Sequence, residues 1–171
     1  VNTVMQISKA TPSDQPLVAL AMNRDNYSCE CIEKEGIFSI SVLSEDTPAT
    51  VIGALGFVSG RHADKLGNVR HKVLIEGVPV IKENTCCWFL CRVKDSMETK
   101  GQKVFVAEVI AGSDEAVGKP MTYQYYVKHL GGASPKQSPT YLPPARTFDK
   151  SSGESFVCSV CGYVYSDPNF G

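Results

Sequence analysis

Two cysteines near the end of the 171-residue chain have the spacing of metal ligands. Cys158 and Cys161 are separated by two residues, and a Cys-x-x-Cys spacing lets one tight turn direct two thiolates at the same ion. Gly162 follows, and because it has no Cβ the backbone can pass close to the sulfur atoms and point amides at them. A tetrahedral ion needs four ligands. The two cysteines are therefore candidates for half of a metal site.

The residues after Cys161 indicate which metal site this is. Residues 162–168 read Gly-Tyr-Val-Tyr-Ser-Asp-Pro. This stretch resembles the first half of rubredoxin, whose first pair of iron ligands lies in Tyr-Val-Cys-x-x-Cys-Gly-Tyr-x-Tyr-Asp-Pro. Phe156 stands in place of the leading Tyr, and Ser166 precedes the Asp-Pro. The second Cys-x-x-Cys of rubredoxin does not occur in the chain, so the resemblance implies an incomplete iron site.

Three other interpretations of the cysteine pair stay open. A zinc ribbon begins with a similar knuckle, although Tyr163, Tyr165 and the proline favour rubredoxin. A dithiol redox motif usually lies between a strand and a helix, and no helix is predicted here. The third interpretation is a pair of surface cysteines without function.

The other cysteines are predicted to be structural. They occur in apolar or helical patterns, and their side chains suit a buried apolar role. Adjacent residues on a strand point to opposite faces, so Cys86 and Cys87 are not expected to share an ion. The total of seven is odd and no signal peptide is expected from the pattern of the first residues, which favours a reducing cytoplasm over a disulfide framework. These five cysteines are Cys29, Cys31, Cys86, Cys87 and Cys91.

The pattern of apolar residues predicts a mainly β protein with a few short helices. Strands are expected at residues 2–8, 17–23, 37–43, 86–94 and 103–110. Residues 25–35 suit a helix that Gly36 ends, and Thr47-Pro48 predicts an N-cap and first position for a helix to about residue 57. The strand at 103–110 is apolar on both faces apart from Glu108. Strands buried on both faces suggest a closed barrel with helices covering its ends.

Composition divides the chain into three parts. Residues 1–130 carry the predicted strands, residues 131–155 are a linker rich in Gly, Pro and Ser, and residues 156–171 start a second domain. The sequence begins within a predicted strand and stops just after the cysteine motif. We therefore expect a fragment of a longer protein that lacks its first strands and its second cysteine pair.

The body of the chain contains an ordered set of segments. Asn-Thr-Val-Met-Gln-Ile-Ser occupies residues 2–8, and Ser-Gly-Arg occupies residues 59–61; the set also includes residues 16–28, 36–46 and 77–80. This order resembles the flavin reductase-like, FMN-binding split-barrel family over nearly all of residues 1–126. Fusion of that domain to rubredoxin resembles the high-molecular-weight rubredoxins, which serve flavodiiron proteins in anaerobes.

Several polar residues are candidate flavin ligands. FMN needs cations and donors for its phosphate, for which Arg24, Arg61 and Lys65 are candidates. Asn23, Asn26 and Ser28 lie at a strand-to-helix turn, where backbone amides are free to bind an anion. The resemblance implies that the phosphate end also contacts Ser59, and that the ring and ribityl chain lie near Asn2, Thr3, Val4, Gln6 and Ser8. Alternatively, Arg61 and Lys65 are solvated surface charges and Asn23 caps the helix.

The resemblance implies an NAD(P)H-dependent oxidoreductase. NAD(P)H would reduce FMN by two electrons, and the flavin would pass them singly to iron and on to an acceptor such as a flavodiiron oxygen or nitric oxide reductase. It also implies a homodimer. Two alternatives are a flavin reductase that releases reduced FMN, and a non-enzymatic redox module. A net charge of -1 and the lack of a long apolar run favour neither nucleic acid nor a membrane as partner.

Overall fold

The structure is a computed structural model that describes residues 4–8, 15–67, 69–132, 156–157 and 164–165, with side chains at 15–67 and 69–132. The chain divides into two units, residues 1–141 and 142–171. The strands of the first unit are β1 (Val4–Ser8), β2 (Leu17–Asn23), β3 (Ile37–Leu43), β4 (His71–Val73), β5 (Pro79–Ile81), β6 (Thr85–Thr99) and β7 (Gln102–Gly112). Its helices are α1 (Tyr27–Glu35), α2 (Ala49–Gly56) and α3 (Tyr123–Leu130), with a 3₁₀ turn at Ile75–Gly77.

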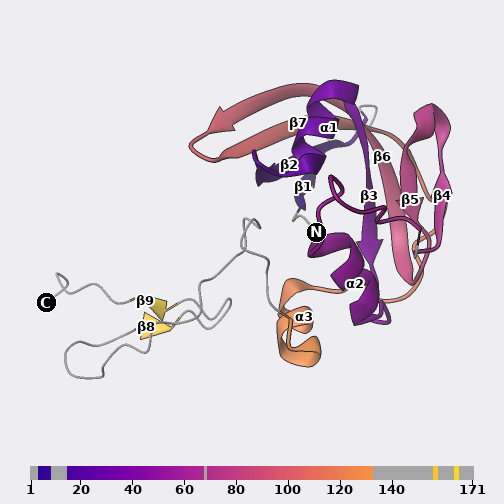
Figure 1. The fold of residues 1–171 in the computed structure, drawn as a ribbon, viewed down its shortest axis with the longest axis vertical. Helices are drawn as coiled ribbons and strands as arrows, with labels where there is room; N and C mark the ends of the chain where they lie inside the picture. The colour runs from indigo at the N-terminus through magenta and orange to yellow at the C-terminus, as the bar shows by residue number, and fades with distance from the viewer. Residues whose placement is uncertain (1–3, 9–14, 68, 133–155, 158–163, 166–171) are drawn as a thin grey trace, which may run out of the picture. The chain divides into compact units, whose positions relative to one another are not determined.

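Five strands form one antiparallel sheet in the order β1-β2-β7-β6-β3 (Figure 1). Among the described strands β1 and β3 are its two edges, so the sheet is an open half-barrel and the expected closure is not observed there. Two further strands, β4 and β5, form a separate ribbon. The predicted mainly β fold with short helices is confirmed.

The main core lies between α1 and one face of the sheet. Cys29 and Ile32 on α1 pack there with Phe38, Cys91 and Phe105. On β6, Phe89 and Val93 pack against the same cluster as Cys91, and these three residues follow the alternation predicted for this strand. Gly36 ends α1 as predicted, with a positive φ of 67° and its N–H donating to the Ile32 carbonyl.

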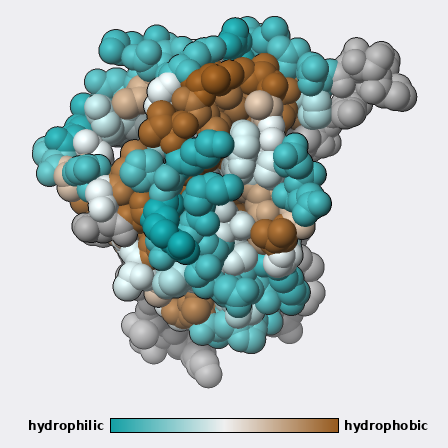
Figure 2. All heavy atoms as spheres, turned by 90° about the vertical axis from the view of Figure 1, so that its right-hand side faces the viewer, coloured by the Kyte–Doolittle hydropathy of each residue, from teal (hydrophilic) through white to brown (hydrophobic). Residues whose placement is uncertain are grey.

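The ribbon of β4 and β5 packs against β3. The Ser39 hydroxyl donates to the Pro79 carbonyl at 2.5 Å, and the Ser41 hydroxyl oxygen accepts from the Ile81 amide at 3.0 Å. On the side of the molecule that carries this ribbon, hydrophobic residues form a band bordered by hydrophilic ones (Figure 2). The most exposed apolar side chains of the ribbon and of the turn that joins its strands are Val73 and Ile75, which are 57% and 67% exposed.

Two β-bulges interrupt the pairing of β6 with β7. Leu90 pairs with Ala111 but Cys91 pairs with Val109, so Ile110 is an extra residue in β7. Nearer the hairpin end, Val93 pairs with Ala107 but Asp95 pairs with Val106, so Lys94 is an extra residue in β6. The two bulges lie on different strands, one on β7 and one on β6, so the two register shifts cancel.

Three sequence predictions need correction. Thr47 is not the N-cap of α2, because Pro48 takes that position and the Thr47 hydroxyl bonds to the Asn84 carbonyl instead. The strand predicted at residues 86–94 extends to Thr99, because its pairing with β7 continues beyond the apolar stretch. Val106 on β7 is 36% exposed, so this strand is only partly covered on its second face. The ribbon of β4 and β5 and the helix α3 were not predicted.

The second unit contributes one described pair of strands. β8 (Phe156–Val157) and β9 (Val164–Tyr165) pair antiparallel and flank residues 158–163. No helix in the described part of the chain has the length and apolar character needed to span a bilayer.

Candidate functional site

The first turn of α1 contains backbone amides that have no acceptor within the helix. Asn26 is extended, with φ -70° and ψ 133°, and its carbonyl accepts from the amides of Cys29 and Glu30 at 2.9 and 3.4 Å. Its side chain makes no capping hydrogen bond. The amides of Tyr27 and Ser28 therefore lie at the positive end of the helix, where an anion is favoured.

A tight turn at residues 59–62 contains the predicted phosphate residues. The His62 amide donates to the Ser59 carbonyl at 3.2 Å, and the Ser59 hydroxyl oxygen accepts from the Arg61 amide at 3.3 Å. The serine thus fixes the turn through both its backbone and its side chain. Arg61 follows directly and projects its guanidinium from this turn.

The structure brings this turn against the start of α1. A Cβ added at Gly60 would lie 2.9 Å from Cδ1 of Tyr27, so the backbone of the turn touches the tyrosine ring. The Arg61 guanidinium lies over the same ring, 5.2 Å from its centroid, and pairs with the Glu30 carboxylate. Segments far apart in sequence, residues 26–28 and 59–61, therefore meet at Tyr27.

Three other predicted phosphate residues are engaged elsewhere. The Arg24 guanidinium pairs with Glu98 at 3.5 Å, and Glu98 is also 3.4 Å from Lys103. Asn23 accepts from the Asp25 amide at 2.9 Å, which makes it a turn residue. The Lys65 ammonium donates to the Leu55 carbonyl at 2.7 Å near the end of α2, and burial lowers the pKa of Lys65.

The residues predicted near the flavin ring lie mainly on β1. Val4, Gln6 and Ser8 pair with β2 opposite Leu20, Ala19 and Leu17. Asn2 and Thr3 lie outside the described residues. Cys158 and Cys161 also lie outside them, between β8 and β9, whose pairing brings the chain back alongside itself.

The donor set at Tyr27 fits a flavin phosphate. A guanidinium, a serine hydroxyl and helix N-terminal amides are the usual partners of a phosphate group. The sequence interpretation missed Tyr27, Glu30 and Gly60. Tyr27 stands between two predicted residues, Asn26 and Ser28, but a tyrosine that fixes an arginine has no motif of its own.

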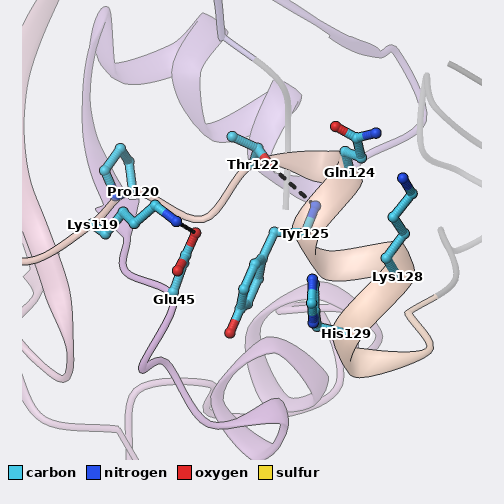
Figure 3. A pocket seen from close by; sticks show the side chains of 8 residues that line it. All are labelled: Glu45, Lys119, Pro120, Thr122, Gln124, Tyr125, Lys128 and His129. Atoms are coloured by element: carbon cyan, nitrogen blue, oxygen red, sulfur yellow. Dashed lines mark hydrogen bonds and ion pairs between the residues drawn. The ribbon is translucent and has the colours of Figure 1, made fainter. Parts of the chain in front are cut away.

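Two open grooves lie apart from these residues. One has a volume of about 510 Å³ and lies beside α3, where Lys119 pairs with Glu45 at 2.9 Å and Tyr125 stacks on His129 at 4.5 Å (Figure 3). Its lining residues are Glu45, Lys119, Pro120, Thr122, Gln124, Tyr125, Lys128 and His129. The other, of about 440 Å³, includes Trp88, Lys72 and Lys82. No predicted ligand lines either groove.

The five cysteines of the first unit are free thiols. Cys29, Cys86 and Cys91 are buried, which agrees with the predicted apolar role, while Cys31 and Cys87 are half-buried. Burial raises the pKa of Cys91 to about 11 and also raises those of Cys29, Cys86 and Cys87. Among residues 15–67 and 69–132, no cluster of three or more His, Cys, Asp or Glu side chains is arranged to hold a metal.

Comparison with known proteins identifies the family. The sequence matches the family described as flavin reductase like domain over residues 1–132. The chain belongs to the flavin reductase-like family. Its fold, predicted from the sequence, is thereby confirmed, as is the prediction of a flavin oxidoreductase.

Relatives of this flavin reductase-like chain extend the comparison. It is 33% identical over 176 residues to the high molecular weight rubredoxin of Moorella thermoacetica, covering 99% of this chain and 75% of that protein. This confirms the predicted resemblance. It is 25% identical to the ferric-chelate reductase (NAD(P)H) of Archaeoglobus fulgidus, over 82% of this chain and 81% of that one.

Solved structures show the same fold. Flavoredoxin from Methanosarcina acetivorans aligns with a TM-score of 0.57 at 19% identity, covering 98% of this chain and 77% of that one. The FMN-binding protein from Thermus thermophilus aligns with a TM-score of 0.55 at 23% identity, covering 67% of this chain and 59% of that one.

Proposed function

We propose that this flavin reductase-like chain binds FMN, receives reducing equivalents from NAD(P)H and passes them to an iron centre that includes Cys158 and Cys161. The acceptor beyond the iron is proposed to be a flavodiiron oxygen or nitric oxide reductase. The contact of the Ser59–Arg61 turn with the first turn of α1 carries the flavin part of this proposal. When bound, FMN would accept two electrons from the nicotinamide nucleotide and release them one at a time.

The residues at Tyr27 have distinct proposed roles. Arg61 neutralises charge on the flavin phosphate, while the hydroxyls of Ser59 and Ser28 and the first amides of α1 donate hydrogen bonds to it. Arg24 and Lys65 act at longer range or support the local structure, since their partners, Glu98 and the Leu55 carbonyl, lie outside the first turn of α1. The ring and ribityl chain are assigned to Asn2, Thr3, Val4, Gln6 and Ser8, with Asn23 and Asn26 at the turn after β2.

The arrangement of the whole chain is part of the proposal. Residues 1–130 form the flavin domain, residues 131–155 act as a tether, and residues 156–171 begin the iron domain. A tether raises the effective concentration of the iron centre near the flavin. We further propose a cytoplasmic homodimer.

The names of relatives support this assignment. A high molecular weight rubredoxin is 33% identical over 99% of the chain. A relative named ferric-chelate reductase (NAD(P)H) supports a nicotinamide nucleotide as the reductant. The fold neighbour named FMN-binding protein supports FMN as the flavin.

The test is a flavin titration of the chain followed by anaerobic reduction. Flavin fluorescence should be quenched on binding, with FMN bound more tightly than riboflavin because only FMN carries the phosphate. Addition of NADH or NADPH should then bleach the flavin absorbance. Failure to bind any flavin, or binding without reduction by either nucleotide, would contradict the proposal.

The relative from Archaeoglobus fulgidus favours a second candidate, direct reduction of ferric chelates. The substitution of both Cys158→Ser and Cys161→Ser, made in a longer chain that also carries the expected second cysteine pair, separates the two functions. If the iron centre carries the electrons, this double variant should retain reduction of FMN by NAD(P)H and lose electron delivery to a protein acceptor. If ferric chelates are the acceptor, their reduction should be unchanged in the variant.

A further inference from the structure

We infer that Tyr27 is a positioning residue that holds Arg61 in place for the flavin phosphate. The inference rests on the proposed FMN site and adds a residue to it. Tyr27 is the first residue of α1, and the residue is 39% exposed. A tyrosine at this position is not needed for the core, which Cys29 and Ile32 fill from the same helix.

The ring of Tyr27 contacts the turn at Gly60. A Cβ at Gly60 would lie 2.9 Å from Cδ1 and 3.3 Å from Cε1 of the ring, so only glycine allows this approach without a shift. The contact fixes where the turn lies against α1. Because Ser59 and Arg61 flank Gly60, the contact also fixes the origins of both side chains relative to the helix amides.

The same ring supports the guanidinium of Arg61. The cation lies 5.2 Å from the ring centroid, within the range of a cation–π interaction. The Nη2 group of Arg61 donates to Glu30, and a guanidinium has five N–H donors in all, so further donors remain for a phosphate. Arginine otherwise loses considerable rotamer freedom on binding, and prior ordering on a ring reduces that loss.

The phenol end of Tyr27 is tied to its own helix. A hydrogen bond with Cys31, one turn further along α1, is the largest of the causes that raise the pKa of Tyr27; the charge of the thiol and burial add to it. Tyr27 therefore stays neutral and brings no negative charge to the phosphate. The ring itself, rather than its hydroxyl, is the part that contacts Gly60 and Arg61.

The test compares Tyr27→Leu with Tyr27→Phe in the full chain, using FMN and riboflavin. Tyr27→Leu should weaken FMN binding by about three- to fivefold, the size of an exposed cation–π interaction, while riboflavin affinity stays unchanged. Tyr27→Phe keeps the ring and should bind FMN like the wild type. Tyr123→Leu, at the first position of α3, is the matched control and should change neither affinity.

A second pair of variants tests the contact at Gly60. Gly60→Ala should weaken FMN binding in the wild type, because its Cβ pushes the turn away from the ring. Combined with Tyr27→Ala, which removes every side-chain atom beyond Cβ, it should cause no loss beyond that of Tyr27→Ala alone, since the obstructing atoms are gone.

Three results would overturn the role of Tyr27. These are unchanged FMN affinity in Tyr27→Leu, an equal loss for FMN and riboflavin, or fully additive losses in the double variant. If the wild type binds no flavin at all, the proposed function fails and this role of Tyr27 fails with it. If the wild type binds FMN and Tyr27→Leu does so equally well, only the inference on Tyr27 fails.

Discussion

The hydroxyl of Thr47 donates to the carbonyl of Asn84 at 2.6 Å, joining the start of α2 to the turn between β5 and β6. Ser44 directs two more donors at this oxygen, its amide at 3.0 Å and its hydroxyl at 2.7 Å. Asn84 is one of two described non-glycine residues with a positive φ, at 47°, and its side-chain amide donates to the Asp46 carbonyl at 3.0 Å. These bonds hold a left-handed residue in place.

We predict that Thr47→Val lowers the free energy of unfolding by about 1 kcal/mol, the usual net value of a hydrogen bond. The side chain is nearly isosteric, and Thr47 is 2% exposed, so water cannot replace the lost donor. Urea denaturation measures the change. Thr50→Val on the exposed side of α2 is the control and should change stability by less than about 0.5 kcal/mol. Equal effects of the two substitutions would contradict the role of Thr47.

Neighbouring positions on β7 should differ sharply in their tolerance of truncation. Phe105 is 1% exposed and lies in the main core, so Phe105→Ala should cost about 3–5 kcal/mol through lost burial and a residual cavity. Val106 is 36% exposed, so Val106→Ala should cost well under half as much. Thermal and urea unfolding measure both changes. Similar losses would show that the second face of β7 is covered in solution.

The buried thiol of Cys91 should make stability depend on alkaline pH. Its pKa is raised from 9.0 to about 11 by burial. In the unfolded chain the thiol ionises near 9.0, so the unfolded state binds fewer protons between these two pH values. The stability contribution is thus complete below pH 9 and is lost as the pH rises toward 11.

Cys91→Ala isolates this effect from other groups that titrate in the same range. The free energy of unfolding of the wild type should fall more steeply between pH 9 and pH 11 than that of the variant, by up to about 1.4 kcal/mol per pH unit. The cavity in the variant lowers its stability at every pH and leaves this comparison of slopes unaffected. Parallel profiles would rule out the assigned pKa of Cys91.

Glu30 should compete with the flavin phosphate for Arg61, because its carboxylate pairs with the same guanidinium. We predict that Glu30→Gln tightens FMN binding by about two- to fivefold at low salt, as suits an exposed ion pair, and leaves riboflavin binding unchanged. Glu33→Gln is the control, since Glu33 lies on the same helix as Glu30 but pairs with Lys103 on β7. Weaker FMN binding in Glu30→Gln would instead show that Glu30 supports the site.

The pattern of apolar residues in short stretches of sequence predicted two strands with their correct bounds. The strands at residues 17–23 and 37–43 match β2 and β3 because each has a clear apolar pattern bounded by polar or turn residues. The ribbon could not be found in this way, since β4 has three residues that are all exposed and owes its place to pairing with β5. For α3 the signals existed: Thr122 caps the helix by accepting from the Tyr125 amide, and Gly131 ends it.

The residue types of the candidate site could be predicted from the sequence, but which residues each side chain contacts could be predicted only in part. Arg24, Arg61 and Lys65 are equivalent as cations in a sequence. Which of them faces the first turn of α1 depends on contacts between residues far apart in the sequence, such as Arg61 and Glu30, which are 31 positions apart. Lys65 instead bonds to a carbonyl, and Arg24 joins Glu98. Tertiary packing decides between them.

The two bulges of the β6–β7 hairpin also bear on which insertions and deletions the family can accept. Loss of Lys94 alone, or of Ile110 alone, would restore regular pairing locally and leave every other partner across the hairpin unchanged. Loss of a residue between them, such as Arg92, would turn Cys91 or Val93 from the core toward the opposite face. Length variation among related chains should therefore concentrate at these two positions, where an extra residue does no harm to the core.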